Sequence, residues 1–132
     1  MKLGMKRFAV VGALGVASAA LAASPAFAKS NISIQATPHA AHVGHVVKVH
    51  GQGGDDANQY TVLVIQERSG KPGHWGHWHA VTRSFSGDAR ANVKATYTGE
   101  LQFRSVLYST DKHHKHAKTD RISTPVTVHV VR

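Results

Sequence analysis

The sequence predicts an all-β fold, a sandwich of antiparallel strands, from three observations. Short runs rich in β-branched residues alternate with clusters of Gly, Pro, Asn and Asp, and no stretch after the leader carries apolar residues at helical spacing. Several of these runs alternate apolar and polar residues, as a strand with one buried and one wet face does. Cysteine is absent, so the core alone must hold the fold together. A chain of roughly 100 residues buries enough surface for that.

The first 28 residues have the pattern of a cleavable secretory signal peptide (residues 1–28). Lys2, Lys6 and Arg7 supply positive charge, a long apolar segment follows, and a small-x-small cleavage site ends at Ala28. The competing interpretation is an uncleaved membrane anchor, because the apolar segment is slightly long for a signal peptide. No later segment approaches membrane-spanning length. We therefore expect residues 29–132 to form an exported domain without a transmembrane segment.

Seven strands are predicted after the leader. In chain order they span residues 31–37, 46–50, 60–68, 78–84, 89–96, 101–109 and 126–131. Pro38 closes the first strand, which suits a sheet edge, and the run from Val62 to Ile65 is apolar on both faces, which is typical of a central strand. Residues 51–56 predict a chain reversal, and the polar segment 111–121 predicts a loop too hydrophilic to pack. Seven strands at this spacing are typical of an immunoglobulin-like (Ig-like) sandwich.

Five segments carry a resemblance to a known class of domains: VGHVVKVHG, VLVIQERSGKPGHW, GDARANVKATYTG, LQFRSVLYS and STPVTVHVV. In their order and character they resemble the Ig-like and fibronectin-like domains of secreted actinobacterial proteins. The resemblance implies a module for adhesion, spacing or binding rather than for chemistry. The chain departs from antibody-type domains, which join two strands by a disulfide over a core tryptophan. It has no cysteine and no tryptophan in its third strand, so no binding residue is transferred from that class.

The 11 histidines are the main departure from an ordinary composition. Six of them form two clusters: His74, His77 and His79, and then His113, His114 and His116. Neutral imidazole is a common ligand of Zn and Cu, and residues two apart on a strand face the same side. A Zn or Cu site is therefore one interpretation. The other is that these are exposed polar side chains, which would still bind Ni or Cu weakly in vitro.

Both tryptophans follow the long third strand: Trp75 comes after the Gly/Pro turn and Trp78 begins the returning strand, with Lys71 and Arg83 on either side of them. An exposed aromatic pair beside positive charge can stack on sugar rings or on bases. In the alternative interpretation Trp78 caps the open end of the sandwich and packs against the core. The stretch from Tyr60 to Arg83 is the predicted binding surface.

Three lysines, Lys112, Lys115 and Lys118, make the polar segment near the C-terminus basic, in a chain whose net charge is +9. A charge run of this kind is usually a solvated loop, but it also attracts anionic polymers. Because export is predicted, an anionic cell-wall polymer or another envelope protein is the expected partner, and nucleic acid is the least favoured one. The sequence leaves the oligomeric state open.

No catalytic motif is present: the chain lacks a GxSxG elbow, an HExxH pair, a P-loop and a spaced pair of carboxylates. No catalytic residue is therefore predicted, and no cofactor beyond Zn or Cu. The sequence predicts a secreted, non-enzymatic binding or structural module of the extracellular space or cell envelope. The alternative is an extracellular Zn- or Cu-binding protein. A small enzyme would require a pocket that holds a histidine near a carboxylate.

Overall fold

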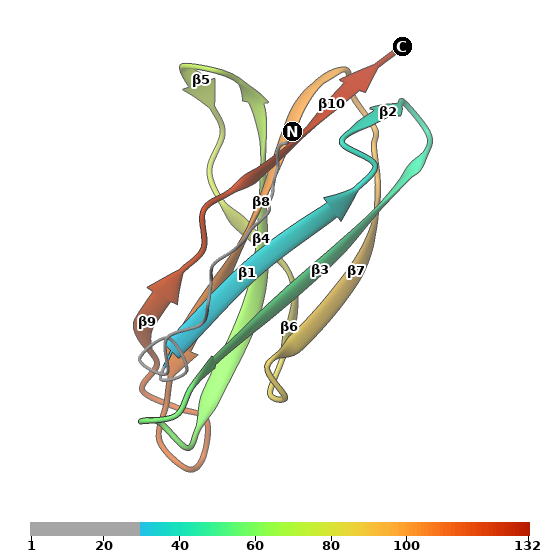
Figure 1. Ribbon diagram of the computed structural model, residues 1–132. Coiled ribbons are helices and arrows are strands. Elements are labelled where there is room, and N and C mark those ends of the chain that lie inside the picture. The colour runs from blue at the N-terminus through green and yellow to red at the C-terminus, as the bar shows by residue number, and fades with distance from the viewer. Residues whose placement is uncertain (1–29) are drawn as a thin grey trace, which may run out of the picture.

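The computed structural model describes residues 30–132, and these form ten strands and no helix (Figure 1). In chain order the strands are β1 (Ser30–Thr37), β2 (Ala40–His42), β3 (Val46–Asp55), β4 (Thr61–Lys71), β5 (His74–Trp75), β6 (His79–Ser84), β7 (Asp88–Lys94), β8 (Gly99–Ser109), β9 (Lys118–Ile122) and β10 (Val126–Val131). Within this part of the chain no helix could span a membrane. The predicted signal peptide lies outside the described residues.

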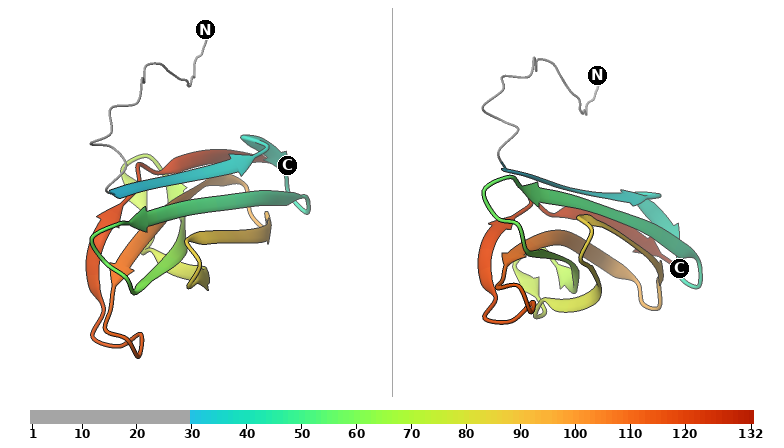
Figure 2. Two further views of the ribbon diagram at one scale, coloured as in Figure 1. Left: turned by 60° about the horizontal axis from the view of Figure 1, so that its bottom comes forward. Right: turned by 90° about the horizontal axis from the view of Figure 1, so that it is seen from below.

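The strands form two sheets that face each other (Figure 2). The smaller sheet has the order β1-β3-β7, and the larger has the order β2-β10-β8-β4. Along the far side of β4, β6 and then β5 pair with successive stretches of the strand, and β10 and β9 do the same along β8. Every described pairing is antiparallel except that of β2 with β10. Two facing antiparallel sheets with this interleaved connectivity are an Ig-like sandwich, so the predicted fold class is confirmed.

The core lies between the sheets and comes from the alternate, inward-facing residues of the long strands. Leu63 and Ile65 of β4 and Phe103 and Leu107 of β8 are fully buried, and Val47 of β3 meets them from the smaller sheet. Each such side chain stabilises the fold by about 1.5–3 kcal/mol through loss of apolar surface to water. Because β4 lies between β8 on one side and β5 and β6 on the other, the prediction of a central strand at Val62–Ile65 is confirmed.

All seven predicted strands are present, and the structure adds the three short strands β2, β5 and β9. Two predicted loops were wrong in part. Residues 51–55, predicted to reverse the chain, continue β3 opposite β1 and β7. The end of segment 111–121, predicted to be too hydrophilic to pack, begins β9, whose exposed side chains need no core because the strand pairs with the edge of β8 through its backbone.

Candidate functional site

The outer face of the larger sheet carries two arginine–glutamine pairs across β4 and β8. Gln66 lies opposite Arg104 in the strand register, and Arg68 lies opposite Gln102. Arg104 Nε donates to Gln66 Oε1 at 2.8 Å, while Arg68 donates through Nε and Nη2 to Gln102 Oε1 at 2.9 and 2.7 Å. Since Ile65 and Phe103 point into the core, strand alternation turns these four side chains outward. The pairs hold both guanidinium groups against the sheet.

Both tryptophans pack on these arginines. The Arg68 Cζ atom lies 4.8 Å from the ring centroid of Trp75 and 4.4 Å from that of Trp78, and Arg104 Cζ lies 4.3 Å from Trp78. We call these four half-buried residues the Trp–Arg ladder. Trp78 therefore lies on guanidinium groups outside the sandwich rather than in the core. Its partners are strand arginines that the sequence alone did not single out.

The arginines of the ladder have no acidic partner. Among residues 30–132, no Asp or Glu forms an ion pair with Arg68 or Arg104. Burial is the main cause that lowers the pKa of Arg104, and the charge of Arg68 acts in the same direction while Tyr108 opposes it. The two like charges thus stand close together on a partly desolvated face. An anion placed there would relieve their repulsion.

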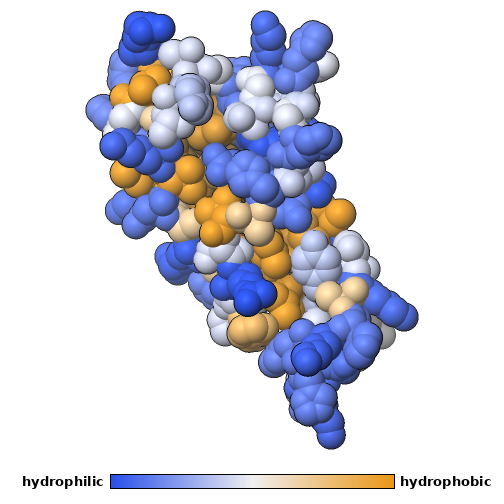
Figure 3. Space-filling model, turned by 180° about the vertical axis from the view of Figure 1, so that it is seen from behind, coloured by the Kyte–Doolittle hydropathy of each residue, from blue (hydrophilic) through white to orange (hydrophobic). Residues whose placement is uncertain are grey.

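The other residues predicted for the binding surface lie around this face. Lys71 is exposed at the end of β4, where it pairs with β5. Arg83, on β6, is exposed and lines a hollow of about 210 Å³ together with Val62, Tyr108 and His114. From behind, the outer face shows hydrophobic surface running down its middle between hydrophilic side chains (Figure 3). The face therefore mixes apolar surface with fixed positive charge.

The histidines of the first cluster do not meet. His74 is exposed on β5, and His77 is exposed in the link to β6. His79 begins β6 and places Nε2 3.6 Å from Glu67 Oε1. Nowhere in residues 30–132 do three side chains of His, Cys, Asp or Glu form a group that could hold a metal ion. The predicted Zn or Cu site thus finds no converging ligands in the described residues.

The histidine side chains of the second cluster also do not converge, and the loop that carries them is arranged around Asp111. His116 Nδ1 donates to Asp111 Oδ2 at 2.8 Å, and the backbone N–H groups of Lys115 and His113 donate to Oδ1. The bond from His116 is the largest cause that lowers the pKa of Asp111, and the Lys115 amide adds to it. The ring of His114 lies 4.3 Å from that of Phe85. The carboxylate thereby organises the loop between β8 and β9.

The basic loop lies far from the tryptophans. Lys112 and Lys115 are exposed between β8 and β9, and Lys118 is exposed at the start of β9. This end of the sheet is where Thr61 pairs with Ser109, whereas β5 joins the opposite end of β4. The two ends lie at opposite ends of the long β4–β8 pair (Figure 1). At the usual rise per residue, roughly 30 Å of extended strand lies between them. The Trp–Arg ladder and the lysines of the basic loop therefore form no single site, although Arg83 shares its hollow with His114 of that loop.

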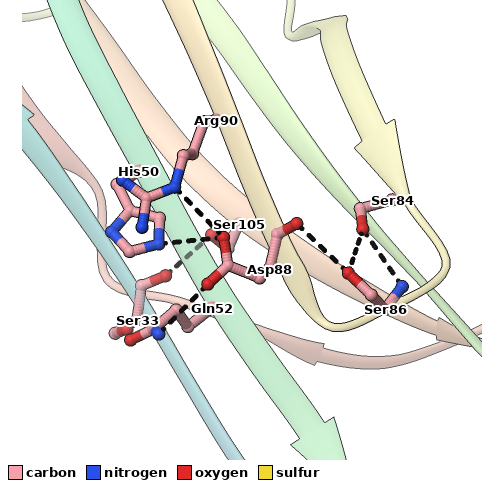
Figure 4. A network of polar contacts seen from close by, with 8 residues as sticks. All are labelled: Ser33, His50, Gln52, Ser84, Ser86, Asp88, Arg90 and Ser105. Carbon is pink, nitrogen blue, oxygen red and sulfur yellow. Dashed lines mark hydrogen bonds and ion pairs between the residues drawn. The ribbon is translucent and has the colours of Figure 1, made fainter.

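The outer face of the smaller sheet carries a separate polar network (Figure 4). Asp88 Oδ1 accepts a hydrogen bond from His50 Nε2 at 3.1 Å and lies 3.4 Å from Arg90 Nε, and Oδ2 accepts one from Gln52 at 3.4 Å. The His50 bond is the largest cause that lowers the pKa of Asp88. Because His50, Gln52 and Arg90 all contact the Asp88 carboxylate, this network links β3 to β7.

One pocket holds a histidine near a carboxylate, as a small enzyme would require. It lies at the edge of the sandwich, has a volume of about 480 Å³, and includes Glu67 and His79 in its lining. The described lining holds no Ser, Thr or Lys in hydrogen-bond contact with His79. A nucleophile activated by that imidazole is therefore not assembled in this part of the chain.

No protein-family model matches the sequence, and no curated protein matches it either. Among solved structures, the fold is similar to the CARDB domain of a Pyrococcus furiosus protein, which was crystallised in complex with di-metal ions. The similarity has a TM-score of 0.42 and 14% sequence identity, and it covers 77% of this chain and 92% of that one. A similarity this low does not assign a family, a ligand or a metal site to the chain.

Proposed function

We propose that the chain is an exported, non-enzymatic module that binds an anionic polymer of the cell envelope through the Trp–Arg ladder. The observation that carries this proposal is the pair of arginines, Arg68 and Arg104, stacked on tryptophan and free of any acidic partner among residues 30–132. Phosphate and carboxylate groups are the natural ligands of a planar guanidinium, which contacts them with two parallel hydrogen bonds.

The arginines keep donors available for such a ligand. Arg104 bonds to Gln66 through Nε, and within residues 30–132 its Nη1 and Nη2 groups make no hydrogen bond. Arg68 bonds to Gln102 through Nε and Nη2, which leaves Nη1 free of a partner in the same part of the chain. The Nη edge of a guanidinium is one of the forks that match a phosphate or carboxylate.

Stacking also prepares these side chains for binding. A free arginine loses rotamer freedom when it is immobilised by a ligand, at a cost of about 0.5–1.5 kcal/mol. In the ladder, Trp75 and Trp78 already hold the guanidinium groups, and the paired glutamines fix their planes. In this proposal the tryptophans act by holding the arginines, and not by stacking on a sugar ring themselves.

The test is binding of the purified protein to a polyglycerol-phosphate chain, measured by calorimetry at low and moderate salt. A variant with both Arg68→Lys and Arg104→Lys keeps the charge but loses the fork, so we expect about a tenfold or greater loss of affinity, as one lost charge-assisted contact of about 1.5–3 kcal/mol implies. Raising the salt should weaken binding by the native protein.

The matched control replaces two lysines of the basic loop, Lys112→Ala with Lys115→Ala. This control removes more positive charge than the double Arg→Lys change but leaves the ladder intact. It should weaken binding by less than the ladder variant does. If the loop variant loses as much affinity or more, the polymer is held by net charge rather than by the ladder, and the proposal is wrong.

A further inference from the structure

The edge pocket of about 480 Å³ exists because β4 is longer than the strands that pair along its outer side. β6 stays paired with β4 as far as Glu67 and His79, and β5 rejoins it at Gly70. Between these points the link makes one backbone bond, from Gly76 N to Ser69 O at 2.9 Å. The smaller sheet has also ended nearby, because β7 stops at Lys94. The edges of the two sheets part here, and the gap between them is the pocket.

Glu67 occupies a position in this pocket that usually belongs to an apolar residue. It follows Leu63 and Ile65 at two-residue spacing on β4, so it points between the sheets, and its partner in the register is the fully buried Phe103. The Glu67 side chain is 18% exposed. Burial is the main cause that raises the pKa of its carboxyl, and His79 acts in the opposite direction. Carboxylates at such positions are rare without a partner.

The described part of the chain supplies no full partner for this carboxylate. The 3.6 Å separation from His79 exceeds the roughly 2.7–2.9 Å of a charge-assisted hydrogen bond. Lys94 also lines the pocket, yet among residues 30–132 it forms no ion pair with Glu67. The second carboxylate of the lining, Glu100, is already engaged by His129 Nδ1 at 2.9 Å. Glu67 is therefore the acceptor left open to a ligand.

An aromatic ring stands at the rim of the same pocket. Tyr97 lies in the turn between β7 and β8, and 81% of its surface is exposed. It also lines a neighbouring hollow with Val43 and Arg132, so the residue lies between two concave regions. A large aromatic side chain this exposed gains little from folding, and the face of a tyrosine ring attracts cations.

We propose that this pocket binds a small organic cation, a primary ammonium or guanidinium group, with Glu67 as its counter-charge and Tyr97 as its aromatic wall. The volume falls within the range of about 300–1,000 Å³ that is usual for small-molecule sites. A metal ion is a poorer fit, because the described residues bring no three ligating side chains together here. An anion is a poorer fit than a cation, because Glu67 has no full counter-charge among the described residues while Glu100 is engaged by His129.

The test is an NMR titration of the intact chain at constant ionic strength with butylammonium chloride, with butylguanidinium chloride and with 1-butanol. We expect saturable shifts at the amides of Gly70 and Tyr97 with the two cations and none with the alcohol, which has the same apolar tail without a charge. Glu67→Gln, nearly isosteric, should weaken binding at least tenfold. Tyr97→Ala, at an exposed position that cannot disturb the core, should weaken it about threefold.

Asp88→Asn is the matched control, since it makes the same change of net charge on the opposite sheet, outside the pocket. It should leave cation binding unchanged. The proposal is overturned by any of three results: equal binding by native protein and Glu67→Gln, an equal loss in Asp88→Asn, or saturation with zinc chloride but not with either organic cation. The amide spectrum of each variant reports whether it is folded. If Glu67→Gln does not fold, the effect of Tyr97→Ala on cation binding tests the proposal instead.

Discussion

Gly51 lies in the middle of β3, at a point where the two sheets come into close contact. A Cβ atom added to it would collide with Ser105 Oγ and would lie 3.3 Å from Ile65 Cγ1. The Ser105 hydroxyl is itself committed, because it donates to Ser33 O at 2.8 Å and so joins β8 of the larger sheet to β1 of the smaller (Figure 4). The absence of a side chain at Gly51 makes room for this bond between the sheets.

We therefore expect Gly51→Ala to destabilise the protein by about 1–3 kcal/mol through overpacking. Ser105→Ala alone should cost about 1 kcal/mol for the lost hydrogen bond. In the double variant the new Cβ atom at position 51 no longer meets a hydroxyl, so the two losses of stability should not add. The loss caused by Gly51→Ala should be smaller by about half or more when Ser105→Ala is already present. Urea unfolding of the four proteins gives the coupling free energy. Simple additivity would show that the collision is not what makes glycine necessary.

At the scale of elements, the long pair β4 and β8 supplies both the core and the ladder. Trp78 contacts two guanidinium groups and Trp75 contacts one, so the two tryptophans should differ in what they contribute. Trp78→Ala should lower the free energy of unfolding by about 1–2 kcal/mol, and Trp75→Ala by about 0.5–1 kcal/mol, at roughly 0.5–1 kcal/mol per cation–π contact. Thermal and urea unfolding measure both. A larger loss for Trp75 would mean that the ring contacts do not stabilise this face.

The sequence predicts β4 well because burial on both faces leaves an apolar run from Val62 to Ile65. It points to the two tryptophans of the ladder but not to its arginines. Arg68 and Arg104 come together only because β4 pairs with β8, a strand distant in sequence. Apolar patterning defines which face a residue occupies, but it does not state which residue lies opposite. Glu67 carried a readable signal, as a carboxylate in line with Leu63 and Ile65.

Gly51 shows how one residue type can indicate two different structures. Glycine suits a reversal and a close contact between sheets equally, so the cluster around it predicted a turn where the structure has a strand. The sequence also did not show that the two histidine clusters lie far apart. Their separation depends on β4 and β8 running antiparallel over their whole length, which places the turns after them at opposite ends of the sheet.

For the whole molecule, the net charge is +9 and only seven residues are acidic, so the titration of each carboxylate matters for how stability depends on pH. Asp88 and Asp111 have pKa values below the usual 3.8, mainly through hydrogen bonds from His50 and His116. A carboxyl whose folded pKa is lowered adds stability that is present above its unfolded pKa and is lost as the pH falls through the folded pKa. Glu67 has the opposite sign, because its raised pKa makes the ionised form a burden on the folded state.

These opposite pKa shifts predict that Asp88→Asn and Glu67→Gln change the free energy of unfolding in opposite directions. Asp88→Asn should be less stable than the native protein at pH 6, and the difference should shrink as the pH falls below 3.8, where the native carboxyl also loses its charge. Glu67→Gln should be more stable than the native protein at pH 7, and that gap should close as the pH falls through the folded pKa of Glu67, above 4.5. Urea unfolding from pH 7 to pH 3 measures both differences. A Glu67→Gln variant less stable than the native protein at pH 7 would mean that His79 already satisfies this carboxylate, and the pocket would then have no open charge to offer a cation.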